Sequence, residues 1–258
     1  GMAKFSFMFG LVQVFAALTS AFSQNIIEAA LGVTTWRPFF NIYGLLGIVL
    51  LVLGTIYIRN PVPVTGGMKE GIGEFFASVL KGIIEVAKIG HVWIASIVGA
   101  AQFGVMLALG VVWGSKLLAV HGLSQSSAAF GASLLWLGLA AGSVAIPWYS
   151  DYAKQRKMPM IVGGVVQLAC LLALLYIPNL GTVAAYLLCF IFGFANAAHM
   201  LAFSTAADVV KPSQIGTSAA LVNGLMFVVG GIMISRPGVR IGLGLESGIT
   251  PKSLELAQ

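Results

Sequence analysis

Seven stretches of about twenty mostly apolar residues constrain the fold of this chain more than any other feature of its sequence. Each stretch is long enough to cross the roughly 30 Å hydrocarbon core of a bilayer as an α-helix, which rises about 1.5 Å per residue. We therefore expect an all-α protein, a polytopic membrane helix bundle of about seven transmembrane helices. The expected spans lie near residues 5–26, 37–58, 91–117, 126–148, 159–178, 182–206 and 214–235.

The composition indicates that lipid is the solvent of this chain. Hydrophobic residues make up 59% of the sequence and charged residues only 9%, far below the quarter that is usual for soluble domains. The net charge of +6 is the excess of 14 Lys and Arg over 8 Asp and Glu. Because the cations are scattered, they argue against a nucleic-acid partner and favour anionic lipid headgroups. Cys170 and Cys189 lie within apolar spans, where we expect them to pack as small apolar residues.

One stretch of the chain is typical of a connection between two halves. Residues 61–67, Pro-Val-Pro-Val-Thr-Gly-Gly, have the composition of a linker. Between Ile72 and Ala87, apolar residues then recur at helical spacing, with Lys and Glu on most of the other positions. This pattern favours an amphipathic helix on the membrane surface, and the alternative is a long extension of the third span.

The distribution of Lys and Arg predicts the orientation, because short positively charged loops stay in the cytoplasm. The less positive side holds Arg37 and Lys116, or five cations if Arg236, Arg240 and Lys252 of the tail are counted. We therefore expect the other side to be cytoplasmic. It holds nine cations: Lys4, Arg59, Lys69, Lys81, Lys88, Lys154, Arg156, Lys157 and Lys211.

Three segments resemble the major facilitator superfamily, whose members have two six-helix halves. The loop from Asp151 to Lys157 is similar to the family's Asp-Arg-x-Gly-Arg-Arg-Lys signature; Asp151, Arg156 and Lys157 fit, whereas most of the residues between them depart from it. Residues 32–40 resemble the Gly-Trp-Arg-x-x-Phe pattern that opens the sixth helix, and residues 215–231 resemble the eleventh helix.

The resemblance implies a register in which the chain corresponds to helices five through eleven of the family. Helices one to four and twelve would be absent, and we expect a fragment, a damaged reading frame or an incomplete gene model. The implied domains are the last two helices of the N-terminal half (1–60), a cytoplasmic linker with an amphipathic helix (61–90), the first five helices of the C-terminal half (91–235) and an extracytoplasmic tail (236–258).

The resemblance also implies a function. We expect part of a secondary active transporter that moves a small solute by alternating access with a coupling proton or cation. The expected location is a bacterial inner membrane, and the expected partners are the solute, membrane lipids and the missing remainder of the transporter. The alternative is a noncatalytic membrane sensor or assembly component.

The charged loop is the candidate for a conformational latch. Asp151 is expected to accept hydrogen bonds at the N-terminus of the helix that begins near Pro212, and Arg156 to pair with Asp208. Lys157 completes the set. From charge alone, the loop cations would only set topology and solvate the loop, since surface pairs contribute little; the family resemblance reverses this preference.

Polar or aromatic residues deep within spans are candidates for a substrate pathway, because such groups are costly in lipid. For each amide, an interhelical hydrogen bond is about as good an interpretation as substrate contact. His199 is either a proton carrier or a neutral, hydrogen-bonded core residue. The candidates are Gln13, Gln102, Trp136, Asn196, His199 and Asn223.

Enzyme function has little support in the sequence. Asp151 and Asp208 could be read as an acid–base or metal pair, but neither has a His or Cys nearby at ligand spacing. No phosphate-binding glycine loop, nucleophile elbow or zinc signature is present. We therefore predict no enzyme activity, no cofactor and no metal.

Overall fold

The computed structural model describes residues 5–58 and 71–246 of the chain. The chain divides into two compact units, a smaller one formed by Ser23–Lys81 and a larger one in which Gly1–Phe22 and Gly82–Gln258 pack together. All regular secondary structure in the described residues is helical, which confirms the all-α prediction.

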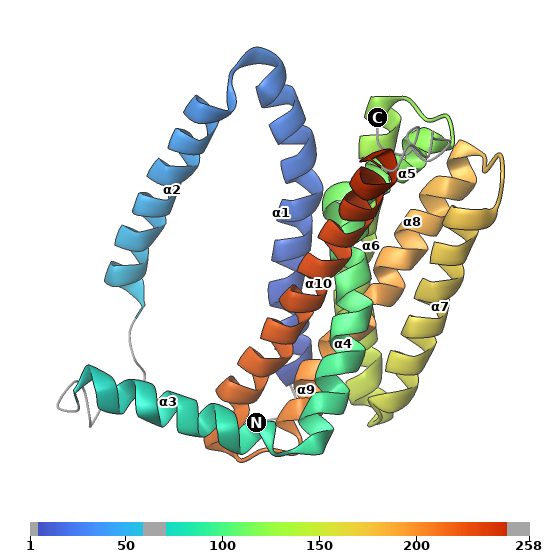
Figure 1. The fold of residues 1–258 in the computed structure, drawn as a ribbon. Helices are drawn as coiled ribbons and strands as arrows, with labels where there is room; N and C mark the ends of the chain where they lie inside the picture. The colour runs from blue at the N-terminus through green and yellow to red at the C-terminus, as the bar shows by residue number, and fades with distance from the viewer. Residues whose placement is uncertain (1–4, 59–70, 247–258) are drawn as a thin grey trace. The chain divides into compact units, whose positions relative to one another are not determined.

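The larger unit is a bundle of helices that run beside one another (Figure 1). Parts of α1 (Phe5–Val33) and α3 (Ile72–Ala87) belong to this unit. Its other elements are α4 (Gly90–Ala108), η2 (Leu109–Trp113), α5 (Gly114–Val120), α6 (Gln125–Ala153), α7 (Lys157–Tyr176), α8 (Thr182–Asn196), η3 (Ala197–Met200), α9 (Leu201–Ala207), η4 (Pro212–Gln214) and α10 (Ile215–Glu246). After α3, the chain forms a continuous rod in which a π-helical turn separates two α-helical segments. A short 3₁₀ turn joins α8 to α9, and another leads into α10.

Six helices of the described chain are long and apolar enough to cross a membrane, judged by length and composition. They match six of the seven expected spans. The first expected span falls within α1 (Phe5–Val33), where a shorter apolar segment, Gly10–Ser23, is found. The six are Trp36–Tyr57, Gly90–Val120, Gln125–Ala153, Lys157–Tyr176, Thr182–Ala207 and Pro212–Arg240.

Helix α2 (Trp36–Tyr57) belongs to the smaller unit and has no buried residue. A helix that is apolar on all sides is stable only where lipid or other protein covers it. Helix α3 (Ile72–Ala87) occupies the stretch in which an amphipathic helix is expected; its place at a membrane surface stays a prediction. The linker at 61–67 lies outside the described residues.

The end of the last span differs from the sequence-based boundary. We expected the seventh span to end near 235 and a tail to follow, but α10 continues through Glu246. Apolar residues persist beyond the two arginines at 236 and 240, and Pro237 lies within the helix. Residues 247–258 lie outside the described chain.

Glycines allow α6 and α8 to approach each other with their backbones in contact. A Cβ atom on Gly193 of α8 would collide with the carbonyl oxygen of Leu135 on α6, and one on Gly138 of α6 would collide with that of Phe190 on α8. Gly10 of α1 approaches the Ser143 carbonyl of α6 in the same way. Small residues at interfaces let helices gain van der Waals contact that lipid cannot replace.

We predict that Gly193→Ala destabilises the protein because the added methyl group has no space against Leu135. Overpacking of this kind typically costs about 1–3 kcal/mol. The measurement is thermal unfolding of the purified protein in detergent, with Gly231→Ala as the matched control. Gly231 is exposed on α10 and has no atom near the position of a Cβ, so the control should leave the midpoint unchanged or slightly higher. Equal midpoints for the two variants would contradict the packing argument.

Candidate functional site

The charged loop between α6 and α7 is closed by its own hydrogen bonds. Helix α6 ends at Lys154, which adopts a left-handed backbone conformation (φ 51°) and donates its N–H to the carbonyl of Ser150. The hydroxyl of Ser150 donates to the carbonyl of Gln155 at 2.9 Å. Lys154 stands where the family signature has glycine, the residue that adopts a positive φ most readily. The turn places Arg156 directly before α7.

Arg156 joins the ends of three helices through two carboxylates. Its Nε donates to Oδ2 of Asp208, at the end of α9, over 2.5 Å, and its Nη2 lies 3.4 Å from Oδ1 of the same residue. Its Nη1 donates to Oδ1 of Asp151 near the end of α6, at 3.2 Å. The Arg156–Asp208 pair expected from the sequence is present. Arginine presents its donors in a planar fork, so a single side chain can bridge two acids.

The two carboxylates keep Arg156 charged. Partial burial, the largest single influence, lowers the pKa of the guanidinium, but hydrogen bonds and charge interactions with Asp208 and Asp151 together raise the pKa above its usual value. A raised pKa in the folded state stabilises the fold at every pH below the ordinary arginine value, and that contribution is lost only as the pH rises through the folded pKa. The pair therefore gives Arg156 no titration in the physiological range.

Other parts of the latch differ from the expectation. No hydrogen bond from the backbone near Pro212 to Asp151 is present in the described chain; Oδ2 of Asp151 is buried without a partner there. Lys157 is exposed, and no ion pair involves it among the described residues. A contact that the sequence did not suggest lies nearby, where Nε2 of Gln214 donates to Oε2 of Glu85 at 3.1 Å.

Two of the pathway candidates meet a third amide in the interior of the bundle. Gln102 of α4 donates from Nε2 to the carbonyl of Met160 on α7 at 2.9 Å. The backbone carbonyl of Gln102 accepts from Nε2 of Gln167 on α7 and Nδ2 of Asn196 on α8, both at 2.8 Å. Gln167 was missed, although it lies mid-span in an apolar stretch and the reasoning that selected Gln102 applies to it equally.

In all three amides, the NH₂ group is hydrogen-bonded and the oxygen is not. Each faces a carbonyl, which only an NH₂ group can satisfy, so the amide oxygens point elsewhere. Oε1 of Gln102, Oε1 of Gln167 and Oδ1 of Asn196 are buried and have no hydrogen-bond partner in the described chain. An unsatisfied buried acceptor costs about 1–3 kcal/mol, so these oxygens mark a place where the packing is not optimised for stability alone.

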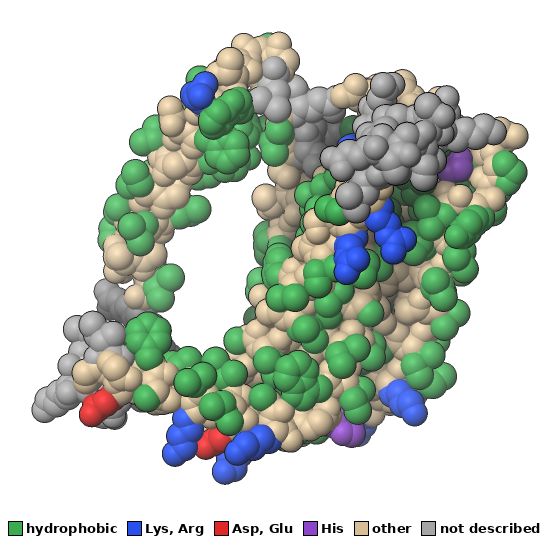
Figure 2. Space-filling model, viewed as in Figure 1, with side chains coloured by type: hydrophobic (Ala, Val, Ile, Leu, Met, Phe, Trp, Pro, Cys, Tyr) green, Lys and Arg blue, Asp and Glu red, His purple; other side chains and the backbone are tan. Residues whose placement is uncertain are grey.

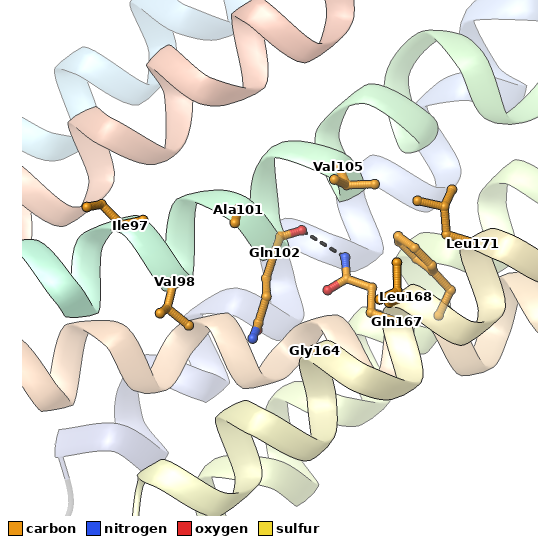
Figure 3. A pocket seen from close by; sticks show the side chains of 10 residues that line it. Ile97, Val98, Ala101, Gln102, Val105, Gly164, Gln167, Leu168 and Leu171 are labelled. Atoms are coloured by element: carbon orange, nitrogen blue, oxygen red, sulfur yellow. Dashed lines mark hydrogen bonds between the residues drawn. The ribbon is translucent and has the colours of Figure 1, made fainter.

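A pocket of about 390 Å³ lies beside this cluster, between α4 and α7. Figure 3 shows the side chains of Gln102 and Gln167 reaching across the space between the two helices from opposite sides. The rest of the lining is apolar, with Val98, Leu168 and Phe192 among the contributors. The volume is within the range of small-molecule sites.

His199 is buried next to the amide cluster. Its Nδ1 lies 2.7 Å from the carbonyl of Asn196, and because a carbonyl only accepts, Nδ1 carries the proton of the neutral ring. Its ring centroid is 4.7 Å from that of Phe103. The structure thus joins Gln102, Asn196 and His199 in one neighbourhood.

The other pathway candidates lie elsewhere. The indole N–H of Trp136 donates to the carbonyl of Gly110 at 3.0 Å, within the π-helical turn η2. Gln13 is half-buried on α1, and Asn223 is exposed on α10. Among the described residues, no group of three or more His, Cys, Asp and Glu could hold a metal ion.

Comparison with known proteins gives one finding. A family model described as Major Facilitator Superfamily matches residues 2–235 of the chain. No curated protein and no solved structure matches the chain.

We predict that Asn196→Leu destabilises the bundle, since it removes the hydrogen bond from α8 to the carbonyl of Gln102. Interhelical hydrogen bonds in membranes contribute about 0.6 kcal/mol on average and up to about 1.7. Asn223→Leu makes the same chemical change at an exposed position and should alter stability little. Reversible denaturant titration in mixed micelles measures both, and a loss no larger for Asn196→Leu than for Asn223→Leu would count against the network.

Proposed function

The chain belongs to the major facilitator superfamily, and on that premise we propose that it is part of a secondary active transporter that moves a small solute by alternating access and uses an ion or proton gradient. The match over residues 2–235 carries this proposal. As a family member with six apolar helices, the chain is an integral, multi-pass membrane protein. We place it in a bacterial inner membrane.

Alternating access needs two bundles that move against each other around a central site. In this proposal, residues 1–60 contribute to one bundle and residues 91–235 to the other, residues 61–90 connect them on the cytoplasmic side, and residues 236–258 are extracytoplasmic. The remainder of a two-half carrier supplies the rest of the pathway. The exposed surface of α2 supports this view, because an apolar helix without buried residues needs a partner or lipid.

Arg156 is the centre of the proposed latch. Its fork links the ends of α6 and α9 through Asp151 and Asp208, so movement of either end must break charge-assisted hydrogen bonds. The pairs are partly exposed, and their strength is of the size that a transporter can make and break in each cycle. Lys157 adds positive charge that retains the loop in the cytoplasm.

The amide cluster is the proposed polar part of the pathway. Gln102 and Asn196 contribute buried oxygens without partners, which a solute or water could satisfy with O–H or N–H donors. Gln13, Trp136 and Asn223 remain candidates for the lining of the wider pathway. The proposed partners are therefore a small solute, membrane lipids and a coupling ion.

His199 is the candidate for proton coupling. With Nδ1 donating to the carbonyl of Asn196, Nε2 of the neutral ring is the nitrogen that can accept a proton. Protonation would place a charge in contact with the amide cluster and change its hydrogen bonding. His199→Gln keeps a donor at this position and removes the titration.

Transport is tested in membrane vesicles that contain this chain together with the remainder of the two-half carrier and that are loaded with a mixture of metabolites. We predict that at least one small solute moves only when a proton or cation gradient is imposed, and mass spectrometry of the lumen identifies it. Asp151→Asn should slow this movement, and His199→Gln should remove its dependence on the proton gradient. If the inserted protein moves no solute under any gradient, the alternative of a noncatalytic sensor or assembly component gains support.

The latch is tested by hydrogen exchange. We predict that Arg156→Gln accelerates amide exchange at the end of α9 about fivefold, since a partly exposed ion pair contributes up to about 1 kcal/mol. Lys157→Gln removes the same charge one residue away and should leave the exchange unchanged. Similar acceleration in both variants would mean that the loop cations only solvate the loop and set its topology.

A further inference from the structure

A second groove lies at the end of the larger unit opposite to Arg156, and the proposed transport cycle does not use it. Its volume is about 280 Å³. Apart from Lys116, its lining side chains are apolar. The rod of α4, η2 and α5 forms one wall, Leu175 of α7 another, and Met233 and Pro237 of α10 the third.

Trp113 holds Lys116 at this groove. The ammonium nitrogen of Lys116 lies 5.1 Å from the centroid of the Trp113 ring, a cation–π contact. The indole N–H of Trp113 donates to the carbonyl of Ile234 on α10 at 2.9 Å, which fixes the orientation of the ring. Both residues line the groove, so a positive charge is kept beside an apolar surface.

Two arginines of α10 add to this charge. Arg236 and Arg240 are exposed and four residues apart, so they share one side of the helix. Arg236 directly precedes Pro237, and Arg240 follows it by three residues, which puts both beside the part of α10 that lines the groove. Figure 2 shows basic side chains gathered near this end of α10.

These cations have no acidic partner among the described side chains. In the larger unit, the acids whose side chains are described are Glu85, Asp151 and Asp208, which pair with Gln214 and Arg156 near the other end of the bundle. Glu246 ends α10, and its side chain is not among those described. In the predicted orientation, Lys116, Arg236 and Arg240 lie on the extracytoplasmic side. The positive-inside rule places cations on the cytoplasmic side, so it does not account for these three. Among the described side chains, no carboxylate neutralises their charge.

We propose that this groove binds one anionic phospholipid of the extracytoplasmic leaflet. The acyl chain occupies the apolar groove, and the phosphate lies at its edge against Lys116, Arg236 and Arg240. Burial of the chain gives affinity in proportion to apolar contact, and charge-assisted hydrogen bonds from Lys and Arg select a net negative headgroup. A free phosphate would gain nothing from the apolar lining, which favours the lipid as the source of the anion.

The test uses the full chain, purified in detergent and titrated with phosphatidylglycerol or phosphatidylcholine, with bound lipids counted by native mass spectrometry. The expected result is one phosphatidylglycerol retained about tenfold more strongly than phosphatidylcholine. The triple variant K116Q/R236Q/R240Q should lose this preference. The control K88Q/K157Q/K211Q makes the same change in net charge near the Arg156 end of the larger unit, and an equal loss in the control would overturn the proposal.

Two further measurements separate the acyl and phosphate parts. Met233→Trp fills the groove without changing charge and should also weaken phosphatidylglycerol binding, whereas retention at full strength would overturn the acyl-chain assignment. Glycerol 1-phosphate should compete poorly, and displacement of the lipid at similar concentrations would show a simple anion site instead.

Circular dichroism and gel filtration establish that each variant is folded. If the triple variant is not, Arg240→Gln alone should lower the preference partially, and an unchanged preference would refute the role of this face.

Discussion

Backbone contact between α6 and α8 is the constraint on which the larger unit depends. Lipid tails are as apolar as leucine, so two helices in a membrane gain little from the hydrophobic effect when they meet. What they gain is close contact, and Gly138 and Gly193 provide it by leaving room for opposing carbonyl groups. Once α6 and α8 are fixed, Asn196 of α8 lies within hydrogen-bonding distance of α4, and the end of α9 lies beside the charged loop that follows α6.

Polar contacts then determine how the remaining helices attach. Gln102 and Gln167 tie α4 to α7 in both directions, and Arg156 ties the loop to α9. The two sets differ in character. The amides are buried, and their oxygens have no hydrogen-bond partner in the described chain. Arg156 is partly exposed and forms ion pairs with both Asp151 and Asp208.

The spans were predictable because hydropathy and length are properties of local sequence, and six of the seven expected segments coincide with long apolar helices. The Arg156–Asp208 pair was also predictable, since few acids stand near the ends of the spans. The partner of Asp151 was not, because the left-handed turn at Lys154 brings Arg156 back toward it. Nor could the sequence separate Asn196, which is buried against Gln102, from Asn223, which is exposed, since both are amides in apolar helices.

The conformation of Lys154 also affects the energetics of the loop. A left-handed backbone costs a residue with a side chain roughly 1–2 kcal/mol, and glycine escapes most of that cost. The loop that positions Arg156 therefore carries this steric cost at Lys154. The hydrogen bonds that join Ser150 to Lys154 and Gln155 hold this turn directly, so the position of Arg156 next to its two acids depends on the end of α6 as well as on the ion pairs.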